Sequence, residues 1–120
     1  MKLEAWAKRF DGEEADLVVD AVEDNLAMVV KAIIDAGDGC IILSQADETY
    51  VQATTKGPVD DGFIVERRDG CAGEHYATDR RANSVELVCM LVGYLRGDPS
   101  WSHAISWHRM IADPDARPSA

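Results

Sequence analysis

The stretch from Gly62 to Thr78, GFIVERRDGCAGEHYAT, decides the fold that we expect. Gly62–Arg68 predicts a strand, and Glu74–Thr78 predicts a second strand that pairs with it. The segment between them is short and begins with Asp69–Gly70, which marks a tight connection. Strands joined by short connections favour antiparallel pairing, because parallel strands need long crossovers.

Two further strands are predicted upstream of this stretch. Cys40–Gln45 (CIILSQ) indicates a mostly buried strand, and Thr49–Thr55 is a second run rich in β-forming residues. The turn between them falls at Ala46–Glu48, whereas Lys56–Asp61 contains a glycine and a proline and predicts a loop.

The first 20 residues give a less regular pattern. Ala15–Ala21 suits a strand, whereas Lys2–Arg9 suits either a strand or a short helix. We expect two strands that are joined around Asp11–Gly12.

A first helix is predicted between these two groups of strands. Its apolar residues recur at the i, i+3, i+4, i+7, i+8 spacing of one helix face. They are Leu26, Val29, Val30, Ile33 and Ile34. Asp24 or Asp20 can cap its beginning, and Gly37 can end it.

A second helix is predicted in the last third of the chain. Asn83 and Glu86 have the spacing of a capping box, and Gly97 suits the left-handed residue that ends a helix. Its apolar face consists of Leu87, Met90, Leu91, Tyr94 and Leu95. Trp101–Met110 predicts a final short strand.

Together these elements predict an α+β fold, in which an antiparallel β-sheet has two α-helices packed on one face. The other face of the sheet then stays open to solvent or to a partner. At 120 residues the chain fits one domain. We expect this domain to span residues 1–112 and a flexible C-terminal tail to span residues 113–120.

The chain is strongly acidic, with 12 basic and 22 acidic residues and a net charge of −10. This balance argues against nucleic acid and anionic membranes as partners, because both are bound by clustered Lys and Arg. The acidic residues are a solubilising surface or, alternatively, a landing surface for a cationic protein.

The three cysteines, Cys40, Cys71 and Cys89, are an odd number without CxxC spacing. No run of signal-peptide length and no apolar stretch long enough for a membrane span occurs in the sequence. We therefore expect reduced thiols and a cytoplasmic protein.

The sequence offers little for catalysis or metal binding. An intervening turn makes Cys71 and His75 poor co-ligands, and His103 and His108 would lie on opposite faces of a strand. Cys71 with His75 is also the one candidate for a nucleophile and base, but the acidic neighbours of Cys71 disfavour a thiolate. We expect no enzyme, no metal and no cofactor.

Other residues with distinctive chemistry are interpreted as structural. Cys40 and Cys89 lie inside apolar runs, which indicates core positions. Trp101, Trp107 and Tyr94 are typical of core packing, with a ligand cage or an exposed interface anchor as the alternatives.

Several motifs in the second half of the chain resemble a known family. The motifs are Phe63–Arg67 (FIVER), Asp69–Gly70, Glu74–Tyr76 (EHY), Tyr94–Trp101 (YLRGDPSW) and Ile105–Trp107 (ISW). They resemble small bacterial immunity proteins of polymorphic toxin and contact-dependent inhibition systems. The likeness covers roughly residues 60–110 and, more weakly, residues 24–55.

This resemblance implies a cognate toxin domain as the partner, inhibited because its active site or a neighbouring surface is covered. Toxin domains that cut or edit nucleic acid tend to be cationic, which suits a net charge of −10. The candidate partner-binding residues are Asp47, Glu48, Glu66, Asp69, Glu74 and Trp101.

Two other functions are compatible with the sequence. One is an adaptor or homo-oligomer without a toxin, in which an open sheet face or an edge strand self-associates, so a homodimer is left open. The other is a small-molecule-binding or enzymatic domain with a pocket around Cys71 and His75.

Overall fold

The computed structural model describes residues 1–8, 14–55 and 57–110 of the chain. Its strands are β1 (Lys2–Lys8), β2 (Glu14–Val18), β3 (Gly39–Ala46), β4 (Thr49–Thr54), β5 (Ile64–Asp69), β6 (His75–Thr78) and β7 (Trp107–Arg109). Its α-helices are α1 (Glu23–Ala36) and α2 (Ser84–Arg96), and short 3₁₀ helices occur at η1 (Val59–Asp61), η2 (Ala72–Glu74) and η3 (Pro99–Ser102).

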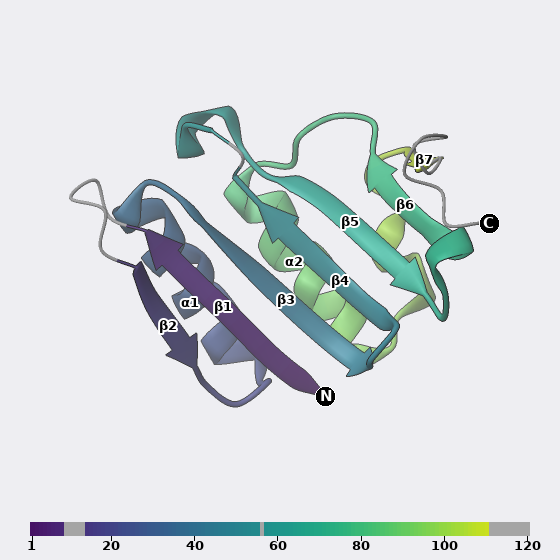
Figure 1. Cartoon of the computed structure of the whole chain (residues 1–120), viewed down its shortest axis with the longest axis horizontal. Helices are drawn as coiled ribbons and strands as arrows, with labels where there is room; N and C mark the ends of the chain where they lie inside the picture. The colour runs from purple at the N-terminus through teal and green to yellow at the C-terminus, as the bar shows by residue number, and fades with distance from the viewer. Residues whose placement is uncertain (9–13, 56, 111–120) are drawn as a thin grey trace.

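The strands form one antiparallel sheet in the order β2-β1-β3-β4-β5-β6-β7. Both helices lie on the same side of this sheet, α1 behind β1 and β3 and α2 behind β4 (Figure 1). The predicted α+β fold is therefore confirmed, including the two N-terminal strands. The turn expected around Asp11–Gly12 and the expected tail at 113–120 lie outside the described residues.

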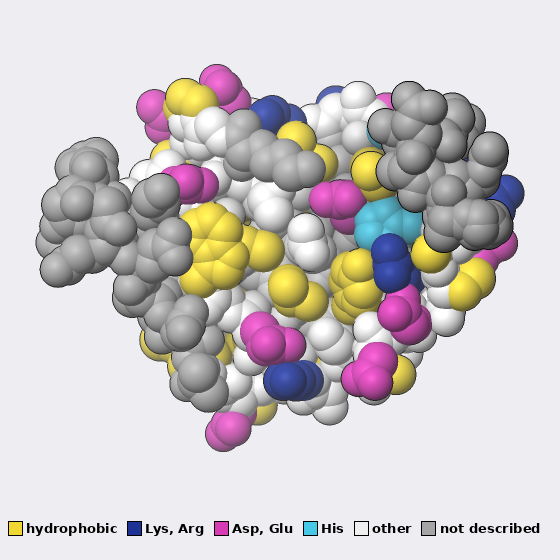
Figure 2. All heavy atoms as spheres, in the orientation of Figure 1, with side chains coloured by type: hydrophobic (Ala, Val, Ile, Leu, Met, Phe, Trp, Pro, Cys, Tyr) yellow, Lys and Arg dark blue, Asp and Glu magenta, His cyan; other side chains and the backbone are white. Residues whose placement is uncertain are grey.

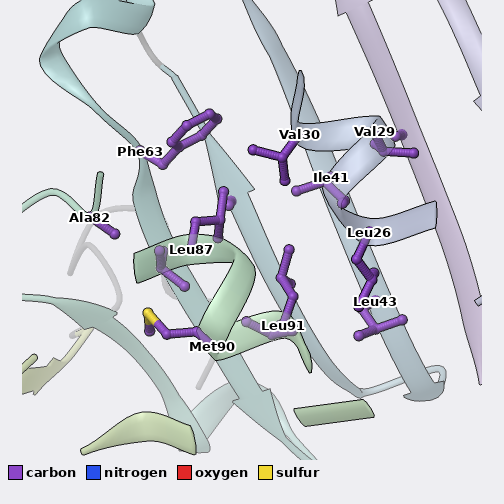
Figure 3. Packing of buried hydrophobic residues seen from close by; sticks show 14 of the residues in the cluster. Leu26, Val29, Val30, Ile41, Leu43, Phe63, Ala82, Leu87, Met90 and Leu91 are labelled. Atoms are coloured by element: carbon purple, nitrogen blue, oxygen red, sulfur yellow. The ribbon is translucent and has the colours of Figure 1, made fainter. Parts of the chain in front are cut away.

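The core fills the space between the sheet and the helices. Its largest side chains are at most 2% exposed. Figure 3 shows Leu26, Val29 and Val30 of α1 and Leu87, Met90 and Leu91 of α2 turned toward Ile41 and Leu43 of β3 and toward Phe63. Full burial of one such side chain contributes about 1.5–3 kcal/mol, so a core of this size stabilises the fold without a disulfide.

Helix α1 begins differently from the expectation and ends as expected. Its N-cap residue is Val22, whose side chain makes no cap, and Asp24 lies inside the first turn, where a carboxylate favours the helix dipole. The Asp20 carbonyl accepts hydrogen bonds from the Asn25 side chain and from the backbone of Val22, so Asp20 shapes the entry to the helix without capping it. Gly37 ends the helix in the left-handed conformation, with a φ of 92°, as predicted.

Helix α2 has the predicted capping box. Asn83 Oδ1 accepts from the backbone of Glu86, and Glu86 Oε1 accepts from the backbone of Asn83. Glu86 also pairs with Arg80, and this pair, followed by the hydrogen bond from the backbone of Asn83, lowers the pKa of Glu86 to about 2. Gly97 ends the helix with a φ of 72°. Neither α1 nor α2, the two long helices among the described residues, is long and apolar enough to cross a bilayer.

Two predictions about apolar residues are wrong. Ile34 is 36% exposed, because α1 covers the sheet with the narrower face formed by Leu26, Val29, Val30 and Ile33. Cys89 is exposed on the outer side of α2, whereas Cys40 is buried as expected.

The predicted strand Trp101–Met110 is also mostly wrong. Pro99 sits at the beginning of η3, and Asp98 caps it by accepting a hydrogen bond from Ser100, so this segment turns instead of extending. His103 follows η3 outside any strand, and only Trp107–Arg109 pairs with β6.

Candidate functional site

The face of the sheet opposite the helices is the broadest candidate for function. Because side chains alternate along a strand, every second residue of each strand belongs to this face. On the central strands these residues are Cys40, Ile42 and Ser44 of β3, Tyr50, Gln52 and Thr54 of β4, and Ile64, Glu66 and Arg68 of β5. Figure 2 shows hydrophobic side chains spread over the middle strands, with charged side chains and a histidine beside them. We call this surface the open face.

A chain of polar contacts crosses the open face from β6 to the β3–β4 turn. The pairing places Arg68 between Tyr50 and His75, and it places Glu66 two residues from Arg68 along β5, on the same face. Arg68 Nε donates to His75 Nδ1 over 3.1 Å, and Arg68 Nη1 donates to Glu48 Oε2 over 2.6 Å. His75 Nε2 lies 3.0 Å from Glu66 Oε1. We call Glu48, Glu66, Arg68 and His75 the polar network.

This network fixes the tautomer of His75. An arginine can only donate hydrogen bonds, so Nδ1 of His75 must accept from Arg68. The ring proton therefore sits on Nε2 and is donated to Glu66. The carboxylate of Glu48 raises the pKa of Arg68 above its ordinary value, so the guanidinium stays charged.

Neighbouring groups hold the polar network in place. The side chains of His75 and Glu66 are only 13% and 10% exposed, although they lie on the face without helices. The ring of Tyr50 stands edge-on to the His75 ring at 6.1 Å, and the Arg68 guanidinium lies 5.7 Å from the centre of the Tyr50 ring. These contacts hold the side chains of the polar network in one arrangement.

The geometry gives the candidate pair of Cys71 and His75 little catalytic potential. Both ring nitrogens of His75 are already engaged, by Arg68 and by Glu66, so neither is free to accept a proton from a thiol. Among the described residues, no group of three or more His, Cys, Asp and Glu side chains is arranged to hold a metal ion.

Cys40 is a poor nucleophile as well. Its burial, and secondly the nearby Glu66 carboxylate, raise the pKa of Cys40 to about 11, so the thiol stays protonated at neutral pH.

Comparison with protein-family models, with curated proteins and with solved structures found no match.

Four of the residues predicted to bind a partner gather at one end of the sheet. Asp47 and Glu48 form the β3–β4 turn, and Asp69 pairs with Thr49 on the neighbouring strand. Gly70 donates its backbone N–H to the Glu48 carbonyl over 2.8 Å, which fixes the two connections side by side. Glu74 follows in η2 and accepts a hydrogen bond from the Tyr76 hydroxyl. We call Asp47, Glu48, Asp69 and Glu74 the acidic end.

The other two predicted residues lie apart from the acidic end. Glu66 is on the open face, where its carboxylate pairs with His75. Trp101 lies on the side of the sheet that carries the helices, where its ring meets Tyr94 at 5.1 Å and Trp107 at 5.7 Å.

The rings of Trp101 and Trp107, together with that of Tyr76, form a cage around an arginine of the same chain. The Arg67 guanidinium lies 5.0 Å from the centre of the Tyr76 ring, 4.9 Å from that of Trp107 and 5.9 Å from that of Trp101. The interpretation of Trp101, Trp107 and Tyr94 as core packing is therefore confirmed, and the cation that the rings surround belongs to the chain itself. Such cation–π contacts are worth about 0.5–2 kcal/mol each, depending on how far the cation is desolvated.

Sequence reasoning missed the N-terminal side of the open face. A hollow of about 560 Å³ lies over β1 and β3, with Trp6, Cys40 and Ile42 in its lining. On β1, Leu3, Ala5 and Ala7 are buried, so Trp6 occupies the side that an alternating strand turns away from the core. A tryptophan at such a position is the signal that could have identified this part of the surface.

Proposed function

We propose that the chain is an immunity protein, which binds a cognate bacterial toxin domain in the cytoplasm and blocks it without chemistry of its own. One observation carries this proposal. No helix in the described part of the chain covers the open face, yet this face carries half-buried aromatic and apolar side chains beside fixed charges. Protein interfaces combine these features, with apolar or aromatic anchors and a polar rim.

The order of the polar network supports binding of a rigid partner. His75, Arg68 and Glu48 are already hydrogen-bonded to one another, so little side-chain entropy is lost when a second protein covers them. Tyr50 pairs with Ser44 across the strands, and Ile42 lies two residues before Ser44 on the same face of β3; Ile42 and Tyr50 provide the apolar contact area.

The acidic end supports a cationic partner. Its four carboxylates lie at one edge of the open face, where Glu48 pairs with Arg68 and Asp69 with Arg67, so Asp47 and Glu74 supply the excess negative charge. An excess of one sign speeds association with an oppositely charged protein, by about 10- to 1,000-fold at low salt where the field is strong. A nuclease or another cationic toxin domain has the charge that this surface attracts. The cysteines Cys40, Cys71 and Cys89 are free thiols, which suits the cytoplasm.

The test is co-expression with the toxin domain encoded by the neighbouring gene. Wild-type protein should restore growth and form a complex at micromolar concentration. Gln52→Arg places a bulky cation in the middle of the open face and should abolish both effects, whereas Met28→Arg adds the same charge to the outer side of α1 and should keep both. Circular dichroism of both variants checks that they fold.

Two outcomes would contradict different parts of this proposal, one the immunity function and the other the binding surface. If wild-type protein neither restores growth nor binds the toxin domain, the immunity function is wrong. If Gln52→Arg protects cells as well as the wild type does, the immunity function stands and the open face is not the binding surface.

A homo-oligomeric adaptor that has no toxin is the second candidate function. It is favoured by an apolar groove on the helix side of the molecule, which also carries the inference below. Failure of toxin binding together with a stable dimer would favour the adaptor.

A further inference from the structure

Helix α2 is apolar on its outer side as well as on its inner side. Of its 13 residues only Glu86 and Arg96 carry charge, and both lie near its ends. Leu87, Met90 and Leu91 fill the core, but Val85 is 72% exposed on the other side. A helix that is hydrophobic all round is normally covered on both sides.

Helix α1 extends this apolar surface. The two helices run antiparallel beside each other, because Glu23 at the beginning of α1 meets Arg96 at the end of α2. Between them lies a groove of about 320 Å³. Its lining is Ala27, Val30, Lys31, Ile34, Ser84, Val85, Val88 and Cys89, and we call it the α1–α2 groove.

The charged residues of the two helices form neutral pairs, apart from the exposed Asp24 in the first turn of α1. Lys31 Nζ lies 2.8 Å from Asp35 Oδ2 within α1. Arg96 Nε lies 2.5 Å from Glu23 Oε1 at one end of the two helices. Arg80 Nη2 lies 2.7 Å from Glu86 Oε2 at the other end. A region with these balanced charges is unusual on a chain with a net charge of −10.

We propose that the α1–α2 groove is the interface between two copies of this chain. A cationic partner gains nothing from a groove whose charges are balanced, whereas a second copy brings an equally apolar and equally balanced surface. Val85 protrudes at the border of the groove, so a two-fold axis would seat each Val85 in the groove of the other copy. The acidic ends lie on the sheet, so this arrangement brings neither of them into the interface.

The area that α1 and α2 offer to a second copy determines how tightly we expect the dimer to associate. A helix of 14 residues is about 20 Å long. Two helices packed about 10 Å apart then offer a footprint of about 400 Å² per copy. Two such footprints bury about 800 Å², less than the roughly 1,200–2,000 Å² of stable interfaces, so we expect a weak dimer that dissociates in the micromolar range.

Light scattering of the purified full-length chain, from 1 to 200 µM, tests the interface. We expect a shift from monomer to dimer that persists at high salt. Val85→Asp should weaken dimerisation at least ten-fold, although it should fold, because an acid in the first turn of a helix is favourable. Val22→Asp is the matched control, since it adds the same charge at the beginning of α1 outside the groove and should leave the dimer intact.

The two exposed thiols provide an independent readout. Cys89 lines the groove, whereas Cys71 lies in the connection between β5 and β6. Alkylation of Cys89 should slow as the protein concentration rises, and alkylation of Cys71 should not. A chain that stays monomeric at 200 µM would overturn the proposal. A dimer that persists in the Val85→Asp variant would also overturn it, and so would a dimer whose formation does not slow the alkylation of Cys89. None of these measurements involves the toxin, so their failure is distinct from failure of the proposed function.

Discussion

Gly93 lies in the middle of α2, where glycine is normally unfavourable. Replacing it with alanine would place a Cβ 2.8 Å from Trp101 Cβ and 3.3 Å from Trp101 Cα. These atoms belong to the base of Trp101 and not to the flexible end of a side chain, so η3 itself would have to move. Gly93 therefore permits the close approach of η3 to α2, and Gly93→Ala tests that contact.

Two opposing effects decide the sign of the change in stability. Alanine favours an α-helix over glycine by about 1 kcal/mol. Overpacking a close contact costs about 1–3 kcal/mol. Because displacement of Trp101 also disturbs its ring contacts with Tyr94, Trp107 and Arg67, we expect the upper part of this range and a net loss of about 1–2 kcal/mol in the free energy of unfolding.

Urea denaturation followed by tryptophan fluorescence and by far-ultraviolet circular dichroism measures this change. The native emission should also shift, because Trp101 is repositioned. Gly73→Ala is the control, since its Cβ would meet the end of the Arg109 side chain at 3.5 Å and Cys71 Sγ at 3.9 Å, both ordinary contacts, and it should be neutral or slightly stabilising. A Gly93→Ala variant that is about 1 kcal/mol more stable than the wild type would refute the packing of η3 described above, because only helix propensity would then remain.

Three further predictions follow from local contacts. Asn83→Ala removes the capping box and should lower the free energy of unfolding by about 1 kcal/mol, measured by urea denaturation, with Asn83→Ser retaining most of the stability. The pKa of Glu86 is about 2 in the folded chain against an ordinary 4.5, so its contribution is present above pH 4.5 and is lost as the pH falls toward 2. Thermal melts between pH 6 and pH 2 should therefore show a shallower loss of stability for Glu86→Gln, and equal slopes would contradict this assignment. At pH 8 and 1 µM, a thiol reagent should modify Cys71 and Cys89 rapidly and Cys40 only after denaturation, because burial raises the pKa of Cys40 to about 11.

The layers of the fold follow from short-range patterns in the sequence. The capping box at Asn83 and the glycines that end the helices depend on residues only a few positions apart, so their geometry could be predicted directly. The same holds for the strand alternation, which identifies the core residues of β3 and β4. Ile34 was misassigned because the apolar spacing does not reveal how wide a strip of α1 the sheet covers.

The polar network was beyond sequence reasoning for a different reason. Glu66 and Arg68 are two apart, which places them on the same face of a strand. Their contact with His75 depends on the pairing register of β5 with β6, which η2 sets within the connection between these strands. The short turn that was expected at Asp69–Gly70 does not define that register. Glu48 joins the network only because Arg68 reaches the β3–β4 turn.

The position of β1 between β2 and β3 has a consequence for hydrogen exchange. The first residues of most domains fray and exchange their amide protons early. Here Ala5 and Ala7 pair with β2 on one side and with β3 on the other, Leu3 pairs with β3, and all three side chains are buried. The amides near the beginning of the chain should therefore exchange with deuterium among the last, at a rate close to that of global unfolding.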